Sequence, residues 1–274
     1  MGLFPYIGGD SRIAQRLVNL LPAGDLLIEA FGGAGSVALE ASRHGLYPQI
    51  ILNDLDVNIY DSFRLIKHNP QSIGLIQAIL NRLVKVIEEA PRQILKQYLK
   101  QIRDDLRAGK MAYPLNGIWN IVLHHVCHVP YKSGLMLRWT DNTNRYNYVH
   151  KHLLERHKLL KRIDLMNVDA FTLLQDHDDP KTVAYIDPPH MLYNGYYRLS
   201  FTPEDAMRLD ELLRSLSMKI MIKLSDADLP YYKLTRLWRK ITIPYTPSNK
   251  PTINTDERRR YHIYMNYRGN GLME

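Results

Sequence analysis

The segment from Val183 to His190 constrains the fold of this chain more than any other. Four residues, Val183 to Ile186, have the length and character of a short buried strand, and Asp187-Pro188-Pro189-His190 follows at once. Such a strand delivers Asp187 to the carboxyl edge of a sheet, where open α/β folds bind their ligands. Each proline fixes φ and lacks an N–H, so the turn is stiff and its carbonyls face no competing local donor. These acceptors suit an amino group on a flat heterocycle, although an ordinary surface turn explains the same residues equally well.

A second strand, turn and helix lie near the N-terminus. Residues 26–31 predict a buried strand, the glycine-rich turn 32–36 follows, and residues 37–43 predict a helix whose N-terminal N–H groups are free to meet a ligand. The turn matches G-x-G-x-x-G only imperfectly, so this signal is weak alone. Asp54 ends the next predicted strand about 20 positions after Gly32, the spacing at which an acid reaches a ribose. Capping of the helix 57–68 is the alternative role of Asp54.

Other segments complete the α/β pattern. Gly8 and Gly9 allow a tight turn with close backbone approach, and Asp10 or Ser11 is expected to cap a helix over residues 12–21. Further strands are predicted at 164–169, 219–224 and 262–267, and a helix begins after Thr202.

The middle of the chain has a different character. Residues 70–109 predict two amphipathic helices, which we expect to belong to an inserted helical subdomain. The stretch 113–148 is aromatic, basic and rich in amides, and could contain a solvated hairpin or a surface that reads DNA. The formal charge of +8 favours a polyanionic partner. The candidate DNA-binding residues are Tyr131, Lys132, Arg138, Asn142, Asn144 and Arg145.

Several other classes of function receive no support. His124, His125, Cys127 and His128 lie in or beside an apolar run and lack the spacing of a closed zinc site, so we expect packed histidines and no metal. The single cysteine suits a reducing compartment, and we see neither a signal peptide nor an apolar run of membrane-spanning length. We therefore expect a cytoplasmic protein with no membrane partner.

Four segments occur in an order that resembles the Dam-type (alpha) class of DNA adenine N6-methyltransferases. They are Pro5-Tyr6-Ile7-Gly8-Gly9, Glu29–Ser36, Asn53-Asp54 and Asp187–His190. The resemblance runs nearly end to end, and it implies a doubly wound, Rossmann-like α/β methyltransferase sheet with an inserted, mostly helical DNA-recognition subdomain. Residues 1–69 and 160–274 would form the methyltransferase domain and residues 70–159 the target-recognition subdomain. The class also implies a bacterial cell or one infected by phage.

The resemblance further implies S-adenosylmethionine as cofactor and an adenine flipped out of duplex DNA as acceptor. By position, Tyr6 and Phe31 would pack on the cofactor, Asp54 would bind its ribose or a neighbouring polar group, and Asp169 and Ala170 would lie near its adenine. The implied catalytic residues are Asp187, Pro188, Pro189 and His190. The implied cofactor residues are Tyr6, Gly8, Gly9, Asp10, Phe31, Gly32, Gly33, Gly35, Ser36, Asp54, Asp169, Ala170 and Asp187.

The chemistry of the residues agrees with this reading. An adenine amino nitrogen is a poor nucleophile because its lone pair is delocalised into the ring. Two acceptors on its hydrogens, Asp187 and the Pro188 carbonyl, would favour a pyramidal nitrogen aimed at the methyl group. Positioning and electrostatics then carry the catalysis, without a metal or a covalent nucleophile.

Two positions depart from the family pattern. His190 stands where the class usually has tyrosine; a flipped base would stack there, at about 1–3 kcal/mol per base, on a smaller ring that can also become charged. We therefore expect weaker base binding and lower activity at acidic pH. Asp10 stands where lysine is common, which removes a positive charge near the cofactor or DNA.

These departures leave three functions open. They are a site-specific DNA adenine N6-methyltransferase, a weak or inactive methyltransferase-fold protein that binds DNA, and a methyltransferase acting on another nucleic-acid amino group. We expect a monomer or a weak dimer.

Overall fold

A mixed sheet forms the centre of the molecule. The structure, a computed structural model, describes residues 2–6, 9–89, 92–127, 147–191, 197–244 and 260–268. Within these ranges the strands follow the order β3-β2-β1-β4-β5-β7-β6. The first five are parallel, and β7 runs antiparallel between β5 and β6. Their bounds are β1 (Leu26–Glu29), β2 (Gln49–Asn53), β3 (Asp164–Met166), β4 (Thr182–Ile186), β5 (Lys219–Ser225), β6 (Arg239–Pro244) and β7 (Arg260–Met265).

Helices cover both faces of this sheet. Successive strand side chains point to opposite faces, so Val183 and Tyr185 of β4 join one hydrophobic cluster while Ala184 and Ile186 join another. The first cluster includes α1 (Ala14–Leu20), α2 (Ser36–His44) and α3 (Val57–His68), and the second includes α8 (Ala170–Asp176) and α9 (Pro203–Ser215). The predicted doubly wound α/β fold is confirmed.

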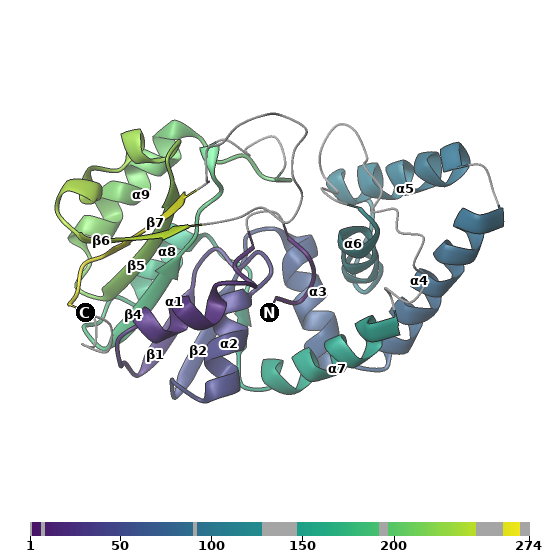
Figure 1. Cartoon of the computed structure of the whole chain (residues 1–274), viewed down its shortest axis with the longest axis horizontal. Coiled ribbons are helices and arrows are strands. Elements are labelled where there is room, and N and C mark those ends of the chain that lie inside the picture. Colours follow the sequence, from purple (N-terminus) through teal and green to yellow (C-terminus); the bar gives the residue numbers. More distant parts are fainter. Residues whose placement is uncertain are drawn as a thin grey trace.

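Four further helices lie between α3 and β3 in the chain. They are α4 (Ser72–Glu89), α5 (Arg92–Arg107), α6 (Leu115–Val126) and α7 (Asn147–Leu160). Helices α4, α5 and α6 gather on the side of the molecule away from β6 and β7, and α7 returns beneath them toward the sheet (Figure 1). The predicted helices in 70–109 are confirmed, whereas the sequence pattern did not define α6 and α7.

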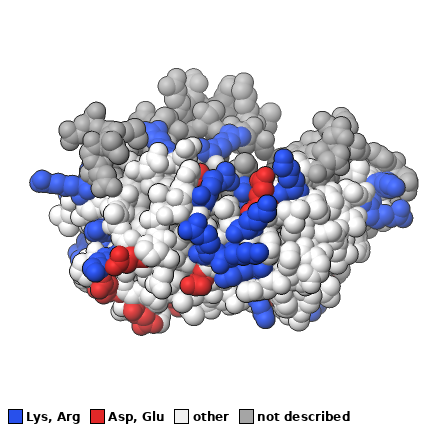
Figure 2. Space-filling model, turned by 90° about the horizontal axis from the view of Figure 1, so that it is seen from below, with Lys and Arg blue, Asp and Glu red and all other residues white. Residues whose placement is uncertain are grey.

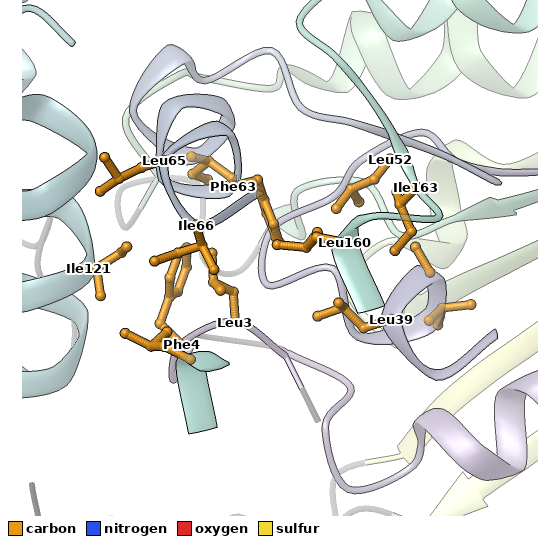
Figure 3. Packing of buried hydrophobic residues seen from close by; sticks show 14 of the residues in the cluster. Leu3, Phe4, Leu39, Leu52, Phe63, Leu65, Ile66, Ile121, Leu160 and Ile163 are labelled. Atoms are coloured by element: carbon orange, nitrogen blue, oxygen red, sulfur yellow. The ribbon is translucent and has the colours of Figure 1, made fainter. Parts of the chain in front are cut away.

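The inserted helices share one hydrophobic cluster with the sheet domain. Phe4 stacks on His124 of α6 at 4.5 Å between ring centroids and lies 6.3 Å from the ring of Phe63 on α3. Figure 3 shows Phe4 near Ile66 and Ile121, in the space between these two helices. Residues far apart in sequence therefore bury the same apolar surface, which stabilises the insert against the sheet. The division into 1–69 with 160–274 and 70–159 stays a prediction.

Several local predictions are corrected. Helix α1 begins at Ala14 without a side-chain cap, because the side chain of Asp10 is bound elsewhere. The cap of α3 is Asp56, which accepts the N–H of Asn58 at 3.0 Å, and so Asp54 is not the cap. Strand β6 lies in a segment that the sequence analysis left unassigned, after two short 3₁₀ helices, η3 (Leu229–Tyr231) and η4 (Lys233–Arg236). No helix among the described residues is both long and apolar enough to cross a membrane.

Candidate active site

A pocket opens at the carboxyl ends of β1, β2 and β4. Strands β2 and β3 lie on one side of β1, and β4 and β5 lie on the other. The direction in which the chain adds strands to the sheet therefore reverses between β1 and β4. Such a reversal is the point at which open α/β sheets bind ligands. The pocket has a volume of about 260 Å³ and is lined by residues that follow these strands, including Phe31, Asp54 and Asp187.

The turn after β1 is held tightly against the end of β2. The N–H of Gly32 donates to the Asn53 carbonyl at 2.7 Å, and the N–H of Gly33 donates to Asp54 Oδ2 at 2.7 Å. Gly33 has a φ of 51°, and a Cβ there would lie 3.0 Å from the ring of Tyr6. The turn therefore needs glycine both for its conformation and for the close approach of Tyr6.

The N-terminus of α2 is occupied by an acid of the chain itself. Glu29, at the end of β1, accepts the N–H of Ala38 at 2.7 Å and that of Val37 at 3.4 Å. The expectation of N–H groups free for a ligand is therefore wrong at Val37 and Ala38. Burial raises the pKa of Glu29 to about 8, against the two N–H bonds, which lower it. A carboxyl at this place makes the pocket a poor site for phosphate and a suitable one for a cation.

Asp54 and Asp56 form the side of the pocket near β2. Asp54 accepts the N–H groups of Gly33 and Asp56, and burial raises its pKa to about 7, with the neighbouring Asp56 adding to the effect. Asp56 Oδ1 in turn binds Arg198 Nε at 2.7 Å. Arg198 thus ties the segment before α9 to the end of β2 across the pocket.

Aromatic rings supply the apolar walls. Phe31 meets Phe201 edge to face, with ring centroids 5.9 Å apart, and Tyr6 lies 6.5 Å from the ring of Tyr197. All four residues line the pocket. Flat apolar walls combined with carboxyls suit a ligand that has a planar ring and a positive charge.

Asp187 is bound by a buried lysine that the sequence analysis missed. Lys223 of β5 is fully buried, and its Nζ lies 2.7 Å from Asp187 Oδ2 and 2.5 Å from Asp10 Oδ1. Asp10 also accepts the hydroxyl proton of Tyr185. The departure from the family pattern at Asp10 suggested that the site lacks a positive charge. The structure shows instead that Lys223 supplies an ammonium next to Asp10.

The ionisation of this cluster follows from its burial and its charges. Burial raises the pKa of Asp187 to about 7 even though Lys223 lowers it, and Asp10 raises it further. Burial disfavours the charge on Lys223, but Asp10 and Asp187 outweigh that effect and raise the pKa of Lys223 above its ordinary value. Lys223 is therefore charged at neutral pH, whereas Asp187 titrates near it.

His190 lies on the other side of Asp187. Its Nδ1 is 2.7 Å from Asp228 Oδ2, and its Nε2 is 3.6 Å from Asp187 Oδ1. Burial opposes the charge of Asp228, but bonds from His190 and Ser225 hold the pKa of Asp228 below its ordinary value. The ring is 2% exposed and stacks on Tyr261 with centroids 5.9 Å apart. Stacking of a base on His190 stays a prediction.

The structure brings most of the predicted site residues into this one pocket. Its lining contains Tyr6, Gly9, Asp10, Phe31, Gly32, Gly33, Ser36, Asp54, Asp169, Ala170, Asp187, Pro188, Pro189 and His190. Gly35 does not line it, and a Cβ there would meet the ring of Phe63 at 2.8 Å. Gly8 and the six candidate DNA-binding residues (131, 132, 138, 142, 144 and 145) lie outside the described residues, as does the predicted hairpin.

Sequence reasoning gave no role to Glu29, Arg198, Lys223 and Asp228. One signal was present for Lys223, which interrupts the apolar run from Ile220 to Leu224 in a predicted buried strand. A lysine in such a strand needs a buried partner. His124 and His125 are packed in α6, and among the described residues no group of three metal-binding side chains is arranged around a point.

Comparisons with known proteins identify the family. A sequence model of the D12 class of N6 adenine-specific DNA methyltransferases matches residues 6–243. A DNA adenine methylase from Serratia marcescens is 24% identical over 91% of this chain and 90% of its own length. A DNA adenine methylase from Salmonella typhimurium is 21% identical over 92% of this chain and 88% of its own. The retron Ec67 DNA adenine methylase from Escherichia coli is 21% identical over 90% of this chain and 84% of its own length.

A solved rRNA methylase from Streptococcus thermophilus covers 92% of this chain and 92% of its own, at 10% identity and a TM-score of 0.35, too low to carry an argument. The match to the D12 class carries far more weight, because the matched residues span every strand from β1 to β5 and contain the whole lining of the pocket, from Tyr6 to Asp205. The chain therefore belongs to the D12 class of N6 adenine-specific DNA methyltransferases.

Proposed function

We propose that this chain transfers a methyl group from S-adenosylmethionine to the N6 amino group of a specific adenine flipped out of duplex DNA. One observation carries the proposal: Asp187, which follows β4, the strand next to β1, lines the same pocket as the turn 31–33 and Asp54. The acceptor for an amino group and the binding surface for a cofactor are thus contiguous. Membership in an adenine-specific family supports the choice of adenine.

The lining of the pocket fits this cofactor. Its carboxyls far outnumber its cations, and Glu29 already occupies the N-terminus of α2, where a nucleotide phosphate would otherwise bind. A sulfonium and an amino group are cations, and opposite charge nearby favours them. Tyr6 and Phe31 would pack on the cofactor, the turn 32–34 would support it, Asp54 would bind its ribose, and Asp169 with Ala170 would lie near its adenine. When bound, the cofactor supplies an electrophilic methyl group.

The side chains of the pocket would then position the acceptor. Asp187 and the Pro188 carbonyl accept the two amino hydrogens, which directs the nitrogen lone pair toward the methyl group. As the bond from nitrogen to the methyl carbon formed and the methyl–sulfur bond broke, positive charge would develop on the nitrogen, and the Asp187 carboxylate would stabilise it until the nitrogen lost a proton. The Asp187 carboxylate need not move at that moment, because Lys223 already holds one of its oxygens.

Long-range attraction to DNA would come from the net charge of +8. Lys and Arg gather in the middle of the face that carries α2 and α7 (Figure 2), so this charge is not confined to the mouth of the pocket. Reading of the target sequence is assigned to the insert, with Tyr131, Lys132, Arg138, Asn142, Asn144 and Arg145 as the proposed contacts. We place the reaction in the cytoplasm of a bacterial or phage-infected cell.

The test is methyl transfer from labelled S-adenosylmethionine to unmethylated duplex DNA, with identification of the product nucleoside. We expect N6-methyladenine from the wild type and none from Asp187→Ala. Asp210→Asn, which removes a buried acid on α9 outside the pocket, is the matched control and should stay active. A methylated cytosine, or a product only with RNA, would replace adenine in DNA as the acceptor. DNA binding without turnover in any variant would favour the inactive, DNA-binding alternative.

A further inference from the structure

Lys223 is the one described side chain that binds both Asp187 and Asp10. It extends from β5, is fully buried, and has its ammonium 2.7 Å from Asp187 Oδ2 and 2.5 Å from Asp10 Oδ1. The third direction is covered by the ring of Tyr261, whose centroid lies 4.5 Å from Nζ. A buried ammonium with partners on every side is fixed in place, because any displacement would break a charged bond in a medium of low dielectric constant.

The two oxygens of Asp187 therefore have different environments. Oδ2 is bound to Lys223, whereas Oδ1 is buried and has no hydrogen-bond partner among the residues the structure describes. Its neighbour in the described part of the chain is His190 Nε2 at 3.6 Å, beyond hydrogen-bond distance, so Oδ1 keeps its acceptor capacity in a residue that lines the pocket. The geometry distinguishes the oxygen that holds the side chain in place from the oxygen that can meet a ligand.

Asp10 determines how much of the Lys223 charge reaches Asp187. One ammonium is shared between two carboxylates, so the negative charge of Asp10 offsets part of the stabilisation that Lys223 gives to ionised Asp187. Tyr185 donates to the second oxygen of Asp10 and keeps that carboxylate in place. Two carboxylates and one ammonium leave a net negative charge beside the pocket, which suits a reaction that passes through a cation.

We propose that Lys223, held by Asp10, fixes Asp187 in one orientation and favours its ionised form, so that Oδ1 is the oxygen that meets the target amino group. Lys223 and Asp10 act through Asp187 and are positioning residues. The inference rests on the proposed function, because it gives Asp187 the target amino group as its partner.

Other ionisable groups near Asp187 must be held constant in any test. They are Glu29 on β1, Tyr185 on β4, His190 and Tyr197 after β4, Asp228 and Tyr232 after β5, and Tyr261 on β7. None of these residues is changed in the variants below.

The experiment measures the ionisation of Asp187 without turnover. The protein is labelled with ¹³C at aspartate carboxyls, the Asp187 resonance is assigned as the one lost in Asp187→Asn, and its midpoint is followed with pH. Opposite charge nearby lowers the midpoint of an acid by roughly 1–3 pH units and like charge raises it. Asp10→Asn should therefore lower the Asp187 midpoint by about one unit or more, and Lys223→Met should raise it by a similar amount. The control Asp210→Asn, which replaces a buried acid of α9, should leave the Asp187 midpoint unchanged.

Opposite shifts in the two variants are the decisive result. An Asp187 midpoint that stays at its wild-type value in both variants would show that neither Lys223 nor Asp10 acts on Asp187, and that outcome overturns the inference. If Lys223→Met does not fold, Asp10→Asn decides alone, since an unmoved midpoint there is sufficient to reject the inference. Opposite shifts in a protein that makes no N6-methyladenine would overturn the proposed function and leave the action of Lys223 on Asp187 standing.

Discussion

Lowering the pH from 8 to 6 should slow methyl transfer about tenfold. Burial raises the pKa of Asp187 to about 7, from an ordinary value near 3.8. A group with that pKa is about nine-tenths ionised at pH 8 and about one-tenth at pH 6. The ionised form accepts the amino hydrogen and stabilises the developing charge, so the rate follows its population. An Asp187 with the ordinary pKa would stay ionised throughout this range, and the rate would be flat.

The assay is kcat/KM for DNA at saturating cofactor, measured across this range at constant ionic strength. Constant salt is essential because phosphate contacts make DNA binding strongly salt-dependent. Circular dichroism at each pH separates loss of activity from loss of fold. Because kcat/KM for DNA reports the enzyme before DNA binds, its acid limb reflects the carboxyl in the cofactor complex.

A second variant separates Asp187 from His190 as the titrating group. The charge on His190 would also lower activity at acidic pH, as the sequence analysis expected. In His190→Asn the amide can still donate to Asp228 but cannot titrate. If Asp187 is responsible, the acid limb persists in this variant. Loss of the limb in His190→Asn would assign it to the imidazole, and a flat rate in the wild type would refute both explanations.

Three further predictions concern the turn, the strand ends and the cofactor pocket. In urea unfolding, Gly33→Ala should lower the free energy of unfolding by about 1–2 kcal/mol, because φ at Gly33 is 51°. The control Gly74→Ala in α4 should be neutral or stabilising, because a Cβ there meets nothing within 4 Å. Asn53→Ala should cost on the order of 2–4 kcal/mol, since its amide binds Ala30 and Val168 while buried; a loss under 1 kcal/mol would contradict this. Binding of the cationic cofactor should release protons and tighten with rising pH, because the pKa of Glu29 is about 8, and calorimetry of Glu29→Gln should show a smaller release.

Local patterns sufficed to predict the residues that follow strands. Asp187 comes directly after an apolar run and Asp54 comes one residue after another, and the carboxyl ends of parallel strands meet at one edge of a sheet. Their presence in a common pocket follows from the strand order, which no local pattern gives and which the structure shows. The start of the helix after Thr202 could also be predicted from the sequence, because its capping box lies within four consecutive residues.

Residues whose role depends on distant partners could not be predicted in this way. Asp10 and Ser11 precede a helix and look like caps, but the buried ammonium of Lys223 binds Asp10 more strongly than a backbone N–H would. Asp228 follows β5 by a few residues, and its role in the site comes from contacts with His190 and Met191, which follow a different strand. Strand β6 was missed although Lys240 to Ile243 alternate polar and apolar residues, because Arg239 and Lys240 follow other basic residues and the segment was interpreted as a basic one.

The distance along the chain between Asp10 and Lys223 has a consequence for biosynthesis. The two residues are 213 positions apart. At a translation rate of about 5–20 residues per second, the ribosome needs roughly 10–40 s to add the lysine after it has added the aspartate. Throughout that interval Lys223 does not yet exist to neutralise Asp10, so the segment that carries this acid stays hydrated. The reaction centre is consequently among the last parts of the molecule to form.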